Sequence, residues 1–318
     1  LENARLMNID LKKTCARAIY NNITDAPFIQ EFSRDIYDRP ILAGSSLKGA
    51  LRTIIFYELF LNKKKPDVTN VLQETINKAR EKRNPYKKNA ASSISKKLFG
   101  ETSNHDLLRV LQVGDASFNK NSLEKNSLEL YDVKMFTLKK FGAAKPDGRK
   151  LCAEMLKPGA ISFVRIVLDE QKSLWDTNYG LNFADNRGIF DDFPQIAREF
   201  AKRWVLRELN LIKNQELMHA ESFYKNTILP LCDGDSKAFP VHLGYASGWR
   251  GMTGDWLSEV DEDLRKEILK TYKISISPKT RKLVSVNENF IPAGWTLLEH
   301  VLKDEYQKHI IGLKNTKI

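Results

Sequence analysis

Residues 41–53 read ILAGSSLKGALRT and lead from a short apolar segment into a helix. Leu47, Leu51 and Ile54 follow at spacings of four and three residues, which places their side chains on one face of a helix. The pattern therefore predicts a helix over residues 46 to about 59, with this face in the core.

The start of this helix has the composition of an anion-binding site. Gly44 gives the backbone freedom to turn, and either Ser45 or Ser46 can cap the helix while its other N–H groups point outward and attract phosphate. Lys48 and Arg52 lie four residues apart, so they share a face and can reach the same anion. An ordinary capped helix with solvated charges fits the same residues. A nucleotide-binding P-loop is excluded, because its Gly-Lys-Ser/Thr sequence does not occur here.

Length and composition indicate a folded protein with a polyanionic partner. The chain has 318 residues, which suggests about two domains, and 42% of them are hydrophobic, too many for a disordered chain. Lys and Arg number 51 against 40 Asp and Glu, so the net charge is +11. This surplus favours nucleic acid or an acidic membrane surface. The three cysteines are widely spaced, which fits a reducing cytoplasm and indicates neither disulfides nor zinc.

Helical and strand-like patterns alternate along the chain and predict an α+β fold. The longest amphipathic helix pattern covers residues 193–218, and residues 160–169 alternate like a strand. The polar stretch between them suggests a boundary that gives domains at 1–175 and 176–318. Shorter strand-like runs lie at 107–115, 239–244 and 273–277.

The positive charge is concentrated in two segments of the first half. Residues 78–97 carry eight basic side chains and one acidic side chain without apolar periodicity, which predicts a loop or insertion. Residues 139–150 hold further basic side chains around a Gly-Ala-Ala-Lys-Pro-Asp-Gly turn. Residues 255–267 are acidic, so we do not expect a uniformly cationic surface.

A second candidate for ligand binding is the glycine-rich segment HLGYASGWRGMTGDWL, residues 242–257. Its glycines allow a ligand to approach the backbone closely, while its aromatic and Arg side chains offer stacking and charge. Turns and tight packing also use glycine, so a structural role stays open. The candidate contact residues are Gly244, Tyr245, Ser247, Gly248, Trp249, Arg250 and Thr253.

These motifs resemble the RAMP superfamily, the repeat-associated RNA-binding subunits of CRISPR effector complexes. Residues 41–53 are similar to its (I/V)PGSSLKGALR signature, with Ala43 in place of the usual Pro. The glycine-rich segment, followed by ISPKTRKLV at 276–284 and IPAGWTLLE at 291–299, resembles one branch, the fifth subunits of type III-A (Csm) complexes.

The resemblance implies a ferredoxin-like, RRM-related fold, here with two degenerate domains and insertions. It implies a crRNA-binding subunit of the prokaryotic cytoplasm that caps the 3′ end of the guide RNA and supports crRNA maturation and complex assembly in antiviral defence. The expected partners are crRNA, the other Csm subunits, chiefly the backbone RAMP subunit, and trimming nucleases; no cofactor and no membrane are expected. The implied RNA contacts are the helix-start residues, the glycine-rich residues named above, and Lys279 and Arg281.

Sequence motifs for catalysis are absent, so we expect no enzyme. The five histidines form no HxH, HExxH or Cys/His cluster, and no metal site is expected. One alternative is a metal-dependent endoribonuclease that trims crRNA, with Asp115 as its acidic residue, although Asp115 fits a turn cap better. Another alternative is a different RAMP subunit, such as the backbone member or a type III-B relative.

Overall fold

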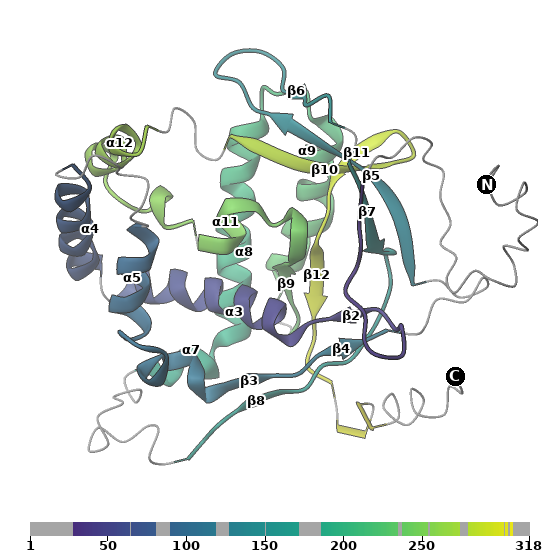
Figure 1. The fold of residues 1–318 in the computed structure, drawn as a ribbon, viewed down its shortest axis with the longest axis horizontal. Coiled ribbons are helices and arrows are strands. Elements are labelled where there is room, and N and C mark those ends of the chain that lie inside the picture. The colour runs from purple at the N-terminus through teal and green to yellow at the C-terminus, as the bar shows by residue number, and fades with distance from the viewer. Residues whose placement is uncertain are drawn as a thin grey trace, which may run out of the picture.

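The structure is a computed structural model that describes most of the chain between residues 28 and 307. Helices and strands mix throughout this part (Figure 1), which confirms the α+β prediction. None of the helices described is long and apolar enough to cross a membrane. The described ranges are 28–63, 65–80, 90–118, 127–149, 151–171, 186–234, 237–253, 255–273, 279–301, 303–304 and 306–307.

A six-stranded sheet forms one side of the molecule (Figure 1). Its order is β1-β7-β5-β10-β11, and β6 pairs with the end of β5. All neighbours are antiparallel except β1 and β7, which are parallel. The sheet therefore combines strands from both sides of residue 175. Its strands are β1 (Ile29–Gln30), β5 (Leu128–Thr137), β6 (Lys145–Pro146), β7 (Leu151–Leu156), β10 (Thr280–Val286) and β11 (Asn289–Pro292).

Three antiparallel strand pairs lie outside this sheet. They are β2 (Ile41–Leu42) with β4 (Ala116–Ser117), β3 (Leu111–Val113) with β8 (Ile166–Leu168), and β9 (Phe239–His242) with β12 (Trp295–Leu298). The β2–β4 pair brings the end of the apolar segment, just before Gly44, beside the turn that joins β3 to β4.

Helix α3 (Gly44–Glu58) is the centre of the largest hydrophobic core. Leu47 and Ile54 are at most 2% exposed and pack in one cluster with Phe239 and Val241 of β9. The predicted helix is confirmed and begins two residues earlier than expected, at Gly44.

Helix α8 (Phe193–Ile212) connects this core to the sheet. Ala197 belongs to the core around α3, whereas Trp204 and Val205 belong to a second core that includes Phe136 of β5 and Leu283 of β10. The helix predicted over residues 193–218 is shorter than expected, because a turn follows Ile212 before the next helix begins.

The remaining helices surround these two cores, with α4, α5 and α12 on the side away from the sheet (Figure 1). They are α4 (Lys65–Arg80), α5 (Ala90–Phe99), α7 (Gly188–Asp191), α9 (Met218–Phe223), α10 (Leu229–Cys232), α11 (Gly248–Thr253) and α12 (Glu262–Thr271). Two π-helical turns, Leu59–Lys63 and Tyr224–Ile228, continue α3 and α9. Short 3-10 turns occupy Ser103–His105, Leu107–Val110, Gly244–Ala246 and Trp256–Ser258.

Several local predictions differ from the structure. The strand expected at 160–169 is reduced to β8, and the run at 107–115 is a 3-10 turn followed by β3. Residues 78–80 and 90–97 of the basic segment are helical, in α4 and α5, where a loop was expected, and residues 81–89 lie outside the described residues. The predicted strand at 239–244 is confirmed as β9. Residues 274–277 of the run at 273–277 and the proposed boundary near 175 also lie outside the described residues.

Candidate nucleic-acid interface

The Asp115 side chain bonds to the amino terminus of α3. The Gly44 N–H donates to Asp115 Oδ1 at 2.7 Å, and Ala43 occupies the N-cap position. The expectation that Ser45 or Ser46 caps the helix is therefore wrong: both lie exposed on the first turn. Because both residues are exposed, an external ligand can reach them.

Gly44 is required by close packing against the neighbouring chain segment. A β-carbon at this position would lie 2.3 Å from the Val113 carbonyl oxygen and 2.6 Å from that of Gly114. No side chain tolerates such distances to a backbone atom. Close packing within the protein therefore explains why this motif has a glycine at position 44.

Lys48 holds the first residue of β3, and Arg52 holds the segment before this strand. Lys48 Nζ donates to the Leu111 carbonyl oxygen at 2.7 Å. The Arg52 guanidinium pairs with Asp106 at 2.8 Å and lies 3.7 Å from the centre of the Phe99 ring. The two cations therefore have different protein partners, and the charge of Arg52 is balanced by a carboxylate.

The glycine-rich segment is folded into two short helical turns rather than a loop. Gly244 and Gly248, with φ of +75° and +63°, each begin one of these turns. Ser247 Oγ donates to the Gly244 carbonyl oxygen at 2.9 Å. Thr253 ends α11, and its side chain lies outside the described residues.

The two motifs singled out in the sequence meet in the structure. Thr53 Oγ1 of α3 donates to the Gly251 carbonyl oxygen of α11 at 3.0 Å. Behind this contact lies a cavity of about 10 Å³ lined by residues of α3, α8, β9 and α11, which is room for about one water molecule. The helix start and the glycine-rich segment therefore belong to one surface, although nearly 200 residues separate them in the chain.

An exposed aromatic–cation pair lies at the sheet end of this surface. The Tyr245 side chain is 43% exposed, and Lys282 Nζ of β10 lies 3.3 Å from the centre of its ring. The exposed Arg149 side chain pairs with Asp147, which raises the pKa of Arg149 and lowers the pKa of Asp147. Trp249, in contrast, is partly buried and packs against Trp256.

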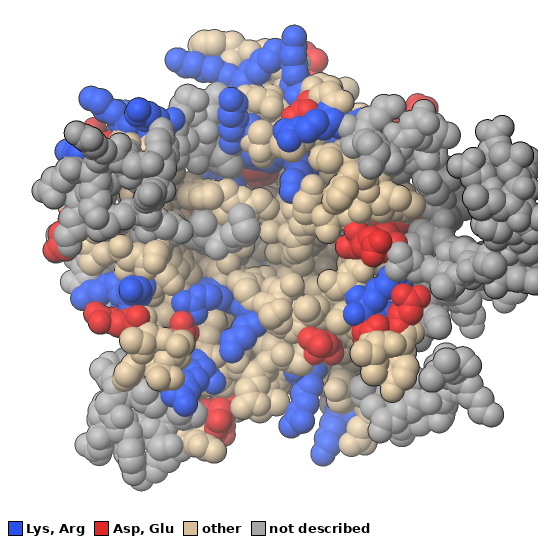
Figure 2. All heavy atoms as spheres, viewed as in Figure 1, with Lys and Arg blue, Asp and Glu red and all other residues tan. Residues whose placement is uncertain are grey.

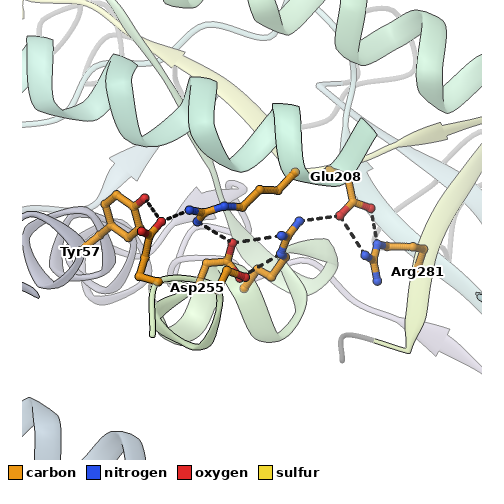
Figure 3. Close-up of polar contacts among 8 residues, drawn as sticks. Tyr57, Glu208, Asp255 and Arg281 are labelled. Atoms are coloured by element: carbon orange, nitrogen blue, oxygen red, sulfur yellow. Dashed lines mark hydrogen bonds and ion pairs between the residues drawn. The ribbon is translucent and has the colours of Figure 1, made fainter. Parts of the chain in front are cut away.

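A buried chain of ion pairs lies beneath the same segment (Figure 3). Glu208 of α8 accepts hydrogen bonds from Arg250 Nη1 at 2.9 Å and from Arg281 Nη2 at 2.8 Å. Arg250 also forms two contacts of 3.0 Å with the Asp255 carboxylate. The chain of ion pairs continues from Asp255 to Arg207 and from Arg207 to Glu259. Glu259 in turn accepts a hydrogen bond from the Tyr57 hydroxyl.

Arg250 and Arg281 are therefore interior residues, which differs from the expectation that they contact RNA. The Arg250 side chain is 4% exposed and that of Arg281 is 12% exposed. Burial alone would raise the pKa of Glu208, but the charges and hydrogen bonds of Arg281 and Arg250 outweigh it and lower that pKa. Lys279, two residues before Arg281, remains exposed.

Sequence reasoning missed Glu208 and Asp255, because a single acid in an amphipathic helix or a turn gives no signal of burial. Lys282 was also missed, although it directly follows Arg281, which was singled out.

The basic stretch after β5 forms a hairpin with a fixed base. Gln215 is 6% exposed. Its side-chain amide accepts a hydrogen bond from the Lys139 N–H and donates one to the Lys139 carbonyl oxygen, both at 3.0 Å. The backbone carbonyl oxygen of Gln215 accepts a hydrogen bond from the Ala144 N–H. At the tip, the Phe141 side chain is 82% exposed, with Lys140 Nζ 5.6 Å from its ring centre. The hairpin thus presents an aromatic ring among lysines.

Basic side chains lie around the central part of one face of the molecule. Figure 2 shows a hollow of mostly uncharged residues there, with Lys and Arg at several points of its rim and at the β6 end, and with Asp and Glu among them. A polyanion lying across this face would meet uncharged contact surface with Lys and Arg side chains within reach.

The described residues contain no group of three or more His, Cys, Asp or Glu side chains that could hold a metal ion. Asp115 has a structural partner in the Gly44 N–H. His242 is enclosed between aromatic rings, and burial lowers its pKa to about 4.

Comparisons with known proteins bear on the family and the fold. The family model described as the RAMP superfamily matches residues 23–313. A chain of a Csm-crRNA-target RNA ternary complex of a type III-A CRISPR-Cas system is similar, with a TM-score of 0.56 and 22% identity over 86% of this chain and 75% of that chain. Csm5 of T. onnurineus is similar with a TM-score of 0.62 and 20% identity, covering 93% and 82% of the two chains. No curated protein sequence matches the chain.

Proposed function

The chain belongs to the RAMP superfamily, and from this premise we propose that it is the crRNA-binding subunit that caps the 3′ end of the guide RNA in a type III-A effector complex. The proposal includes two degenerate ferredoxin-like, RRM-related domains and a cytoplasmic location in a prokaryote. Its support is the similarity in fold to Csm5 and to a chain of a Csm-crRNA-target RNA complex.

The observation that carries the proposal is the exposed Tyr245–Lys282 pair beside the junction of α3 and the glycine-rich segment. An exposed ring with a cation on one face offers a platform for a base or ribose, because aromatic stacking tolerates every base. The neighbouring lysines of the β5–β6 hairpin supply charge for phosphates.

We assign the direct contacts to the residues that the surface presents. Ser45 and Ser46 donate hydrogen bonds from the first turn of α3, and Lys48 adds charge beside them. Tyr245 stacks, while Lys282 and Arg149 contact the backbone of the RNA. Four other candidate residues pack against or pair with protein groups, and we assign them a supporting role: Gly44, Arg52, Arg250 and Arg281.

The protein acts by binding and assembly. As a terminal subunit it needs one contact with the backbone RAMP subunit, so native mass measurement of the complex should count one copy. Several copies would identify it as a backbone subunit. Trimming nucleases would be separate partners.

The test of RNA binding compares Tyr245→Ala with Tyr37→Ala. Both tyrosines are about half exposed, and each has a cation over its ring, Lys282 or Arg39. Loss of stacking at Tyr245 should weaken binding of single-stranded RNA by about 1 kcal/mol or more, while Tyr37→Ala should leave it unchanged. Equal affinities of the two variants would contradict the assignment.

A second measurement separates binding from catalysis. Purified protein incubated with RNA and Mg²⁺ should leave the RNA at full length. Shortening of the RNA that Asp115→Asn abolishes would identify a nuclease instead.

A further inference from the structure

The geometry points to Glu208 as the positioning residue of the proposed RNA surface, because its carboxylate holds the two elements that carry Tyr245 and Lys282. This inference rests on the proposed function and adds a residue that contacts no RNA itself. Glu208 is 1% exposed and lies on α8, beneath both elements (Figure 3).

The Glu208 carboxylate fixes β10 through both of its oxygen atoms. It pairs with the Arg281 guanidinium through two nitrogen atoms, with Nη2 at 2.8 Å. Successive side chains of a strand point to opposite faces of its sheet. Anchoring Arg281 toward α8 therefore turns Lys282 to the other face, where it meets the Tyr245 ring at 3.3 Å.

Oε2 of the same carboxylate also fixes the glycine-rich segment. Arg250 of α11 donates to Glu208 Oε2 at 2.9 Å and is also held by Asp255, which lies two residues after the end of α11. Asp255 adopts a left-handed conformation with φ of +54°, which an Asp residue accepts only where its surroundings determine it. Arg250 within α11 and Asp255 just after it are thus tied to the same buried charges.

Burial of these charges is costly, and well-packed apolar side chains of similar size would give similar stability. What an apolar core would lack is directional contact between one carboxylate and two guanidinium groups. This directionality supplies a reason for the ion pairs: they set the position of the glycine-rich segment, which carries Tyr245, relative to β10, which carries Lys282.

The experiment uses the full chain and two variants. Glu208→Gln removes the buried negative charge that faces Arg281 and Arg250, so this variant can fail to fold. Glu208→Gln with Arg281→Met removes one charge of each sign, leaves Arg250 paired with Asp255, and should fold. Glu199→Gln, an exposed change on the same helix, is the matched control. Ile76→Ala truncates a buried side chain of α4. This variant controls for a loss of global stability.

We expect the double variant to show faster hydrogen exchange at residues 244–253 and 280–286. Its affinity for single-stranded RNA should fall about fivefold or more, because coupling between two linked sites changes an affinity by at least about this factor. The dependence of affinity on salt should keep its slope. Glu199→Gln and Ile76→Ala should keep both the affinity and the local exchange pattern.

Wild-type exchange and affinity in the double variant would overturn the inference. A salt slope reduced by about 0.7 would also overturn it, because Arg281 would then contact a phosphate directly. If the wild-type chain bound no RNA, the proposed function would fail, whereas the exchange pattern would still decide whether Glu208 holds the two elements.

Discussion

Two glycines of α3 have opposite surroundings, although they lie five residues apart in one motif. A β-carbon at position 44 would overlap the Val113 carbonyl oxygen at 2.3 Å, whereas one at Gly49 would meet nothing within 4 Å. Gly44→Ala should therefore destabilise the protein by about 2 kcal/mol. Gly49→Ala should stabilise it by about 1 kcal/mol, because alanine favours an exposed helical position. Denaturant unfolding of both variants measures the difference, and equal effects would contradict the close packing of Gly44.

His242 should make stability depend on pH. Burial lowers its pKa from 6.5 to about 4, and its ring stacks on Trp295 at 4.7 Å. As pH falls below 6.5 the unfolded chain takes up a proton that the folded chain does not, so the folded state loses stability as pH falls. The loss attributable to His242 should be about 2 kcal/mol between pH 7 and pH 5.

The variant His242→Phe isolates this contribution. It keeps an aromatic ring but loses the bond from Nε2 to the Ala293 carbonyl oxygen, which costs about 1 kcal/mol at any pH. Urea unfolding at pH 7 and pH 5 should give a smaller pH dependence for this variant than for the wild type. Equal pH dependence of the two proteins would contradict the assignment to His242.

The sequence could not predict which arginines face inward. Arg250 and Arg281 have the surroundings expected of RNA contacts: glycines and aromatics for the first, other basic residues for the second. Their partner Glu208 lies 42 and 73 residues away, and no local pattern connects positions at such distances. Lys48 and Tyr245 keep accessible surface, so their assignment as RNA contacts stays a prediction.

At the scale of elements, helices were easier to predict than strands. The apolar periodicity of α3 and α8 is contained within each helix, and their positions could be read directly. A strand depends on a partner elsewhere in the chain. Residues 160–169 alternate as a strand should, but β3 offers only three residues for pairing before the chain turns to cap α3 at Asp115. Only the matching three residues of β8 form a ladder.

The hairpin between β5 and β6 gives a prediction at this scale. Because Gln215 holds its base and Phe141 at its tip packs little, Phe141→Ala should leave stability within about 0.5 kcal/mol of wild type. If RNA passes the hairpin, the same variant should bind RNA more weakly. Ile161→Ala, which removes another side chain with 79% exposure, is the control. An unchanged affinity for Phe141→Ala would exclude the tip from the RNA surface.

At the scale of the whole molecule, the two halves of the chain share their interior. The six-stranded sheet takes β1, β5, β6 and β7 from the first half and β10 and β11 from the second, and the core around α3 includes Phe239 and Leu264. We therefore expect one cooperative unfolding transition, with tryptophan fluorescence and far-UV circular dichroism giving the same midpoint. Two separate transitions would support the division near residue 175 that the sequence suggests.

The chain of ion pairs beneath α11 also constrains how this sequence can change over evolutionary time. The carboxylates of Glu208, Asp255 and Glu259 face the guanidinium groups of Arg207, Arg250 and Arg281. Substitution of one member leaves a buried charge without its counterpart, at a cost of about 3–5 kcal/mol, whereas the loss of one acid together with one base keeps the balance. Among relatives of this protein, these positions should therefore vary in acid–base pairs and rarely one at a time.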